Sequence, residues 1–217
     1  GLSGNTIFNS GQIQSVTMNI TGGTVSNSGD MLAGGELNMS GLNIFNANEA
    51  LMQSKSVTDV NGNFVSNKGS IVSGEQLNVV AHGITNSGQL QSYQGMSLNA
   101  ESSGGQLTNS GRITSNAQLT IIADTVNQSG SILGYQDMTV ESLDYNQSGS
   151  VIVGENLTQN TTNWNHSGQT KVVGNHELNA DKIVNNNGVL SAKNLSANSL
   201  SLFNSGSIIG IESLDVS

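Results

Sequence analysis

The stretch Asn86-Ser87-Gly88-Gln89-Leu90-Gln91-Ser92 decides the fold, because variants of it return along the whole chain. Its Asn-Ser-Gly core, or a variant of that core, occurs eleven times, at intervals of 18 to 23 residues that average about 19.5. The last residues of the copies are Gly11, Gly29, Asn48, Gly69, Gly88, Gly111, Gly130, Gly149, Gly168, Gly188 and Gly206. A fixed period of this length is typical of a solenoid, in which each repeat stacks on the next.

Apolar residues keep fixed distances from this anchor residue. The fourth residue before it is always apolar or aromatic: Ile7, Val25, Ile44, Val65, Ile84, Leu107, Val126, Tyr145, Trp164, Val184 and Leu202. The second residue after it is apolar in every copy except one: Ile13, Met31, Ala50, Ile71, Leu90, Ile113, Ile132, Val151, Thr170, Leu190 and Ile208. Further apolar residues follow eight and often ten positions after it, as at Leu77 and Val79. Inward positions two residues apart indicate strands.

Each repeat is therefore interpreted as three short strands separated by tight corners. A unit of about 19 residues cannot bury a face alone, so equivalent strands of successive repeats should pair in parallel, ~4.8 Å apart. The prediction is an all-β fold, a parallel β-helix of about eleven coils that forms a single unit over residues 1–217. Ten intervals at this spacing give a rod roughly 50 Å long.

A polar column accompanies the apolar ones. The second residue before the anchor is Asn in eight copies: Asn9, Asn27, Asn46, Asn67, Asn86, Asn109, Asn186 and Asn204. Gln128, Gln147 and His166 hold the other three places. A side-chain amide both donates and accepts, so the column should form a hydrogen-bonded ladder along the rod. We expect the anchor residue to be Gly, or Asn at Asn48, because the corner requires a positive φ.

Composition excludes several classes of function. The 217 residues include 27 Gly but no Pro and no Cys, so disulfides and Cys-based zinc sites are ruled out. Six basic residues stand against fifteen acidic ones, for a net charge of −9. Such a surface disfavours nucleic acid and anionic membranes as partners. The apolar runs are far too short to span a membrane, and no signal peptide is visible at the start.

The repeats resemble a known family. Asn86-Ser87-Gly88-Gln89-Leu90-Gln91-Ser92 and Gln118-Leu119-Thr120-Ile121 look like the haemagglutinin repeats of two-partner-secretion exoproteins. That family includes filamentous haemagglutinin and the CdiA effectors of contact-dependent growth inhibition. The resemblance covers essentially the whole chain. It implies a right-handed, single-stranded parallel β-helix, and secretion through an outer-membrane two-partner-secretion transporter to form an extracellular filament at the bacterial cell surface.

Some features of that family are missing from this sequence. There is no secretion-domain motif with its Asn-Pro pair, no Val-Glu-Asn-Asn boundary motif and no toxin module. We therefore expect a segment excised from a longer filament. The resemblance implies a non-enzymatic shaft or a segment that contacts an outer-membrane receptor on neighbouring bacteria. The alternative is an adhesin segment of the filamentous haemagglutinin type, which binds a host surface or glycans.

A polysaccharide-acting β-helix enzyme is the third possibility. A lyase site needs clustered acids beside a basic residue, yet Arg112 is the only Arg. On the coil register Asp124, Asp144 and Asp181 could line one flank, but they do not converge on a site. The three His residues do not form a ligand set either. We expect no catalytic residues, no metal and no cofactor.

Recognition is expected where the period is interrupted, because loops leave the rod there. The 21-residue interval directs attention to Asp59, Asn61 and Phe64, and the 23-residue interval to Ser102 and Ser103. Tyr93 and Tyr135 share a register five residues after their anchors and would form an exposed pair. The alternative remains open that the loops are tolerated slack and that the aromatic residues have no binding role.

Overall fold

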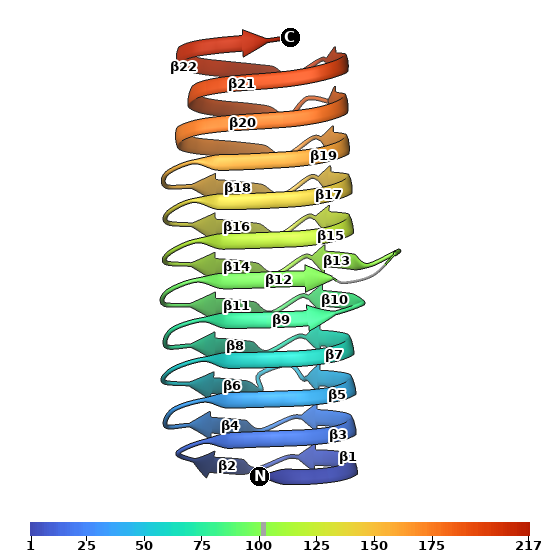
Figure 1. Cartoon of the computed structure of the whole chain (residues 1–217), viewed down its shortest axis with the longest axis vertical. Helices are drawn as coiled ribbons and strands as arrows, with labels where there is room; N and C mark the ends of the chain where they lie inside the picture. The colour runs from blue at the N-terminus through green and yellow to red at the C-terminus, as the bar shows by residue number, and fades with distance from the viewer. Residues whose placement is uncertain (101–102) are drawn as a thin grey trace.

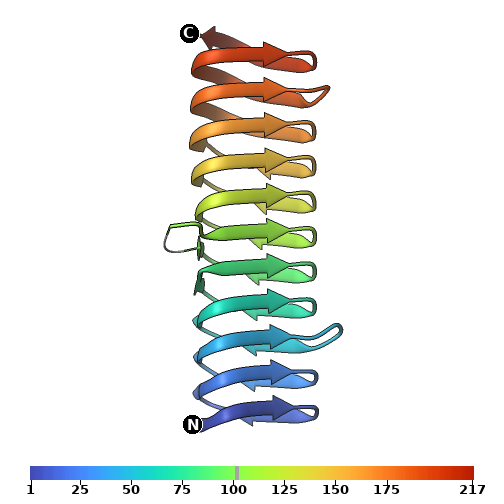
Figure 2. The same cartoon turned by 90° about the vertical axis from the view of Figure 1, so that its right-hand side faces the viewer.

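The computed structural model describes residues 1–100 and 103–217 as one rod of parallel strands, wound in a right-handed sense with the termini at opposite ends (Figures 1 and 2). The strands are β1 (Leu2–Asn9), β2 (Gln12–Ser15), β3 (Met18–Asn27), β4 (Asp30–Ala33), β5 (Leu37–Asn46), β6 (Leu51–Ser54), β7 (Thr58–Asn67), β8 (Ser70–Ser73), β9 (Leu77–Ala81), β10 (Gly83–Asn86), β11 (Gln89–Ser92), β12 (Met96–Ala100), β13 (Gln106–Asn109), β14 (Arg112–Ser115), β15 (Leu119–Gln128), β16 (Ser131–Gly134), β17 (Met138–Gln147), β18 (Ser150–Val153), β19 (Leu157–His166), β20 (Gln169–Asn185), β21 (Val189–Asn204) and β22 (Ser207–Val216).

Every strand pairs in parallel with its equivalent one coil away, which confirms the predicted parallel β-helix of about eleven coils. Val25, for example, lies between Ile7 of β1 and Ile44 of β5. The same stacking continues up to β22, with one register shift in each of the last two pairings, β20–β21 and β21–β22. Like residues therefore lie above like, so each sequence column becomes a continuous stripe along the rod.

Two of the three predicted strands of a coil are usually continuous. β3 and β15 each run for ten residues and bend near the middle, at Gly22 and Ala123 respectively. The bend lies in a column of small residues because little space remains there: a Cβ added to Gly22 would lie 2.9 Å from the Gly4 carbonyl oxygen. Only β9–β10 and β12–β13 show separate strands at this position among the described residues.

The apolar columns form the core, with two corrections to the predicted register. Met52 rather than Ala50 pairs with Met31 and Ile71, and is fully buried. Ile183 rather than Val184 pairs with Trp164 and Leu202. The extra residues of the longer intervals lie within the corners, where Glu49 and Asn187 adopt φ values of 64° and 60°. An inserted residue is therefore absorbed before the next strand begins.

The predicted amide ladder is present inside the rod. Each Nδ2 donates to the side-chain oxygen one coil further on, as from Asn67 to Asn86 at 2.8 Å. The ladder runs without a break through Asn9, Asn27, Asn46, Asn67, Asn86, Asn109 and Gln128. It also links Asn185 to Asn204 at 2.8 Å, so Asn185 and not Asn186 occupies the column.

The anchor glycines are needed for a different reason from the one predicted. The one described Gly with a positive φ is Gly104, which lies outside the anchor column. A Cβ on Gly111 would instead overlap the carbonyl oxygen of Gly88, and one on Gly130 would overlap that of Gly111. Successive coils approach each other so closely at this corner that no side chain fits. The expected left-handed conformation at Asn48 is likewise wrong, because Glu49 adopts it.

The buried column should not tolerate charge. Ile132 is fully buried, whereas Asp137 lies exposed in a corner and accepts from Asn156. We expect Ile132→Asp to lower the free energy of unfolding by several kcal/mol, because an unpaired charge would enter the core. Asp137→Asn keeps the acceptor oxygen and should change stability by less than about 1 kcal/mol. Thermal unfolding followed by circular dichroism compares the two, and equal melting temperatures would contradict the register.

The hydrogen bonds of the interior ladder should contribute far more to the free energy of unfolding than the equivalent hydrogen bonds on the surface of the rod. Asn67→Leu leaves the Asn46 amide and the Asn86 carbonyl oxygen without their ladder partner, which should cost about 2–4 kcal/mol. The control is Asn165→Ala, which removes an exposed 2.8 Å hydrogen bond to Asn146. Urea unfolding should show a shift of the midpoint for the first variant only. Similar shifts for both would show that the interior ladder has no special role.

Candidate functional site

The amide ladder changes character over the coils of β15, β17 and β19. No side-chain hydrogen bond joins Gln128 to Gln147 among the described contacts, and Gln147 instead bonds to Thr170 at 2.8 Å. His166 bonds to Asn185 through Nδ1 at 3.0 Å. The predicted substitutes Gln128, Gln147 and His166 therefore occupy the column, but the chain of amides that begins at Asn9 ends at Gln128.

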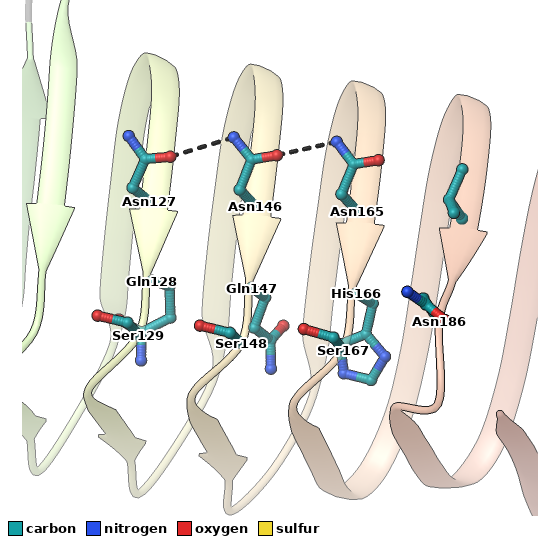
Figure 3. A pocket seen from close by; sticks show the side chains of 11 residues that line it. Asn127, Gln128, Ser129, Asn146, Gln147, Ser148, Asn165, His166, Ser167 and Asn186 are labelled. Carbon is teal, nitrogen blue, oxygen red and sulfur yellow. Dashed lines mark hydrogen bonds between the residues drawn. The ribbon is translucent and has the colours of Figure 1, made fainter.

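A shallow groove of about 350 Å³ lies over this corner (Figure 3). On its rim Asn165 donates to Asn146 at 2.8 Å, and Asn146 donates to Asn127 at 3.1 Å. The remaining lining consists of hydroxyl and amide side chains together with His166 and Val184. Burial lowers the pKa of His166 although its hydrogen bond to Asn185 opposes this, so the imidazole is neutral near pH 7. The groove can hydrogen-bond to a ligand, but its lining offers no charged group for acid–base chemistry.

Polar side chains also enter the apolar core beneath this groove. His176 takes a place held by Leu157 in the coil before and by Leu195 in the coil after. Both His176 ring nitrogens, Trp164 Nε1 and Gln159 Nε2 are buried without a hydrogen-bond partner. The Trp164 and His166 rings stack with their centroids 4.6 Å apart. Burial, with a smaller contribution from His166, lowers the pKa of His176 to about 3.

The 21-residue interval does not form the predicted loop. Asp59, Asn61 and Phe64 all lie on the regular strand β7, because the two extra residues are taken up at residues 47–50. Asp59 accepts a 2.7 Å hydrogen bond from Asn78, and Asn61 is exposed on the same side of the strand. Phe64 follows the bend and is half-exposed, and its ring forms a T-shaped pair with the His82 ring. The placement of these residues in a protruding loop is therefore wrong.

The predicted tyrosine pair has the expected register. The backbone N–H groups of Tyr93 and Tyr135 bond at equivalent places two coils apart, with Asn116 between them. Each tyrosine is 55% exposed. They lie at the corner after the short strands β11 and β16, away from the bend in β7, so the structure does not bring them together with Asp59, Asn61 and Phe64.

The 23-residue interval does depart from the regular coil, between β12 and β13. Ser103 and Gly104 form an exposed turn, and the Gly104 N–H donates to the Asp124 carboxylate at 2.5 Å. Ser102, which was predicted with Ser103, lies outside the described residues. A groove of about 650 Å³ runs along the rod from this turn, lined by residues of β12, β15, β17 and β19.

The sequence reasoning missed this groove. Its edges carry Ile122 and Leu143, whose side chains are 37% and 54% exposed, beside the carboxylates of Asp124 and Glu141. Outward apolar residues on strands that otherwise alternate strictly were the available signal. The groove combines apolar surface with negative charge, which suits the binding of another molecule better than a reaction.

The described residues show neither a metal cluster nor a membrane helix. No three His, Cys, Asp or Glu side chains in residues 1–100 and 103–217 gather closely enough to hold a metal ion. No helix of sufficient length and apolarity to cross a membrane is found over the same residues.

The buried histidines should make the rod sensitive to acid. Their pKa values in the folded state lie below the usual 6.5, so the unfolded chain binds more protons and stability falls as the pH drops from about 6.5 toward 3. His176→Leu restores the residue type of the column and should raise the melting temperature and weaken this pH dependence, by a few kcal/mol at the acid end. Melting curves at pH 7 and pH 4 test this, with His82→Leu, at a half-buried position, as control. An unchanged pH dependence in His176→Leu would contradict the assignment.

Three comparisons with known proteins bear on identity. No protein-family model, no curated protein and no solved structure matches the chain.

Proposed function

We propose that this chain is a non-enzymatic segment of a secreted, filamentous exoprotein of the CdiA type, acting at the bacterial cell surface as shaft or receptor-binding stick. The observation that carries the proposal is the stack of parallel coils, with its apolar columns and internal amide ladder. This construction gives length and stiffness. It resembles the haemagglutinin repeats of two-partner-secretion exoproteins in sequence, and the fold expected for them is the fold observed.

A solenoid suits a task that is defined by distance. Each coil contacts its neighbours in the stack and adds about 4.8 Å, so the rod holds its surfaces at fixed positions along an axis. The partners that follow from the proposal are an outer-membrane receptor protein on a target bacterium and, for the longer protein, an outer-membrane two-partner-secretion transporter. Secretion to the extracellular filament also belongs to the proposal.

The exposed tyrosines favour a second candidate, an adhesin segment of the filamentous haemagglutinin type that binds host surfaces or glycans. Tyr93 and Tyr135 stand two coils apart on one corner, which is about 10 Å. Aromatic rings at such a spacing can stack on sugar rings. The grooves contain apolar and hydroxyl groups but no paired acid and base, so we place the polysaccharide-acting enzyme third.

Competition on living cells tests the leading proposal. Susceptible target bacteria incubated with the 217-residue chain should become protected from contact-dependent inhibition in a concentration-dependent way, because the chain occupies the receptor. The heat-denatured chain is the control and should not protect. Binding to cells without protection, abolished by Tyr93→Ser and Tyr135→Ser and by added glycans, would favour the adhesin. Absence of both binding and protection would leave only the shaft.

A further inference from the structure

A long furrow follows the bend of the coils on the C-terminal half of the rod. Its floor is a column of small residues that are all wholly or largely buried: Ala100, Ala123, Ser142, Thr161, Ala180 and Ser199. The groove of about 650 Å³ beside the Ser103–Gly104 turn is its first part. A second groove of about 560 Å³ continues it and shares Asn160 and Thr161 with the first. We call the whole feature the corner furrow.

The two walls of the corner furrow carry apolar and acidic residues in crossed positions. On β15, Ile122 stands on one wall and Asp124 on the other. On β17 the order is reversed. Glu141 pairs with Ile122 on the first wall, and Leu143 takes the place equivalent to Asp124 on the second wall. A ligand that lies along the furrow therefore meets an apolar and an acidic group at each of two successive levels, about 4.8 Å apart.

The second part of the corner furrow repeats these properties. Asp181 and Leu200 line it, and the Leu200 side chain is almost fully exposed. Amides fill the opposite wall, where Asn179 donates to Asn160 at 3.0 Å and Asn198 donates to Asn179 at 2.8 Å. This wall is already held in place by its own ladder, so a ligand would meet a preformed surface.

The carboxylates in the corner furrow have no cationic partner in residues 1–100 and 103–217. The one ion pair among the described residues is Lys193–Glu212, which lies elsewhere. Asp124 is held at one end of the furrow by the Gly104 N–H, which leaves its charge in place. With six basic residues against fifteen acidic ones, the rod as a whole attracts cations. A ligand that is complementary in charge to the furrow is therefore positively charged.

The dimensions favour an extended peptide. From Asn99 to Asn198 the furrow spans five coil intervals, or roughly 24 Å, which is the length of about seven extended residues at ~3.3 Å each. Neighbouring residues of an extended segment point to opposite sides, so such a segment can contact both walls at once. Small floor residues let its backbone approach closely. A nucleic acid or an anionic lipid would be repelled by Asp124, Glu141 and Asp181.

We propose that the corner furrow binds an extended segment of a partner protein that carries both basic and apolar side chains on each of its two faces. This inference rests on the proposed function in one respect, that the partner is the receptor met by the filament. The basic groups pair with Asp124 and Glu141, and the apolar groups cover Ile122 and Leu143. The contact gives recognition by charge and shape rather than great affinity, because the walls remain partly open to solvent.

Peptides provide the direct test. The probe is a blocked nonapeptide in which Lys and Leu are interspersed with Ser, and its comparison peptide has Glu in place of Lys. Fluorescence anisotropy at low salt should show binding of the Lys peptide that weakens with added salt, and no binding of the Glu peptide. Absence of binding by the Lys peptide would overturn the proposal. So would displacement of that peptide by a neutral oligosaccharide.

Matched variants locate the site. Glu141→Lys has no side-chain hydrogen bond to lose and should weaken binding of the Lys peptide about tenfold, because one attraction becomes a repulsion. Glu155→Lys changes the net charge equally but lies at the corner after β18, so its effect should be less than about twofold. Leu143→Asn should weaken binding while the equally outward Ile152→Asn should not. Equal losses within either pair would overturn the assignment to the furrow.

The cell assay separates this inference from the proposed function. If the chain protects target bacteria and Glu141→Lys protects equally well, the corner furrow is wrong while the function stands. If the Lys peptide binds and depends on Glu141, but the chain gives no protection, the furrow stands and the receptor-binding role is wrong. All four substituted side chains are on the surface, so unchanged melting temperatures are the control for folding.

Discussion

The structure depends on one constraint, that every residue lies next to its own equivalent in the coils before and after it. In-register parallel pairing at about 4.8 Å places each side chain beside the equivalent side chain of the next coil. Branched aliphatic groups satisfy this by packing, and amides satisfy it because each one both donates and accepts. A column of like charges would repel itself at this spacing, and only 10% of the residues are charged. The composition is thus a consequence of the stacking.

The same constraint explains what could be predicted from the sequence. Inward columns repeat because the core selects them, so the fold, the strands and most of the ladder followed from spacing alone. Ala50, Val184 and Asn186 were assigned to columns that Met52, Ile183 and Asn185 occupy, because the assignment counted a fixed number of residues across each corner. A corner can hold extra residues, with Glu49 or Asn187 at a positive φ, while the buried side chains on either side keep the strands in register. The positions of the anchor glycines were predicted correctly, but the reason for them was wrong. They are needed because successive coils approach closely, and the sequence of a single repeat does not show this approach.

The candidate site was harder to predict for the opposite reason. Outward positions face solvent and are not selected by stacking, so nothing in the sequence shows which of them share a groove. Asp59 and Phe64 were placed in a loop because the interval was long, although the length is absorbed one corner earlier. The corner furrow could be recognised only after the bend in β15 and β17 had placed Ile122, Glu141 and Leu143 around a floor of small residues.

Inward columns are constrained by packing, whereas outward columns are not, and this difference affects how such a rod can acquire a function. The interior tolerates a polar layer at His176 and Gln159, because a coil contacts few others and the rest of the stack remains intact. The exterior is freer still, since a change at Leu143 or Glu141 alters no core contact. A shaft can therefore gain a binding surface on any group of coils without loss of stiffness. For this architecture, shaft and receptor-binding segment are two uses of one construction, and the outward residues alone distinguish them.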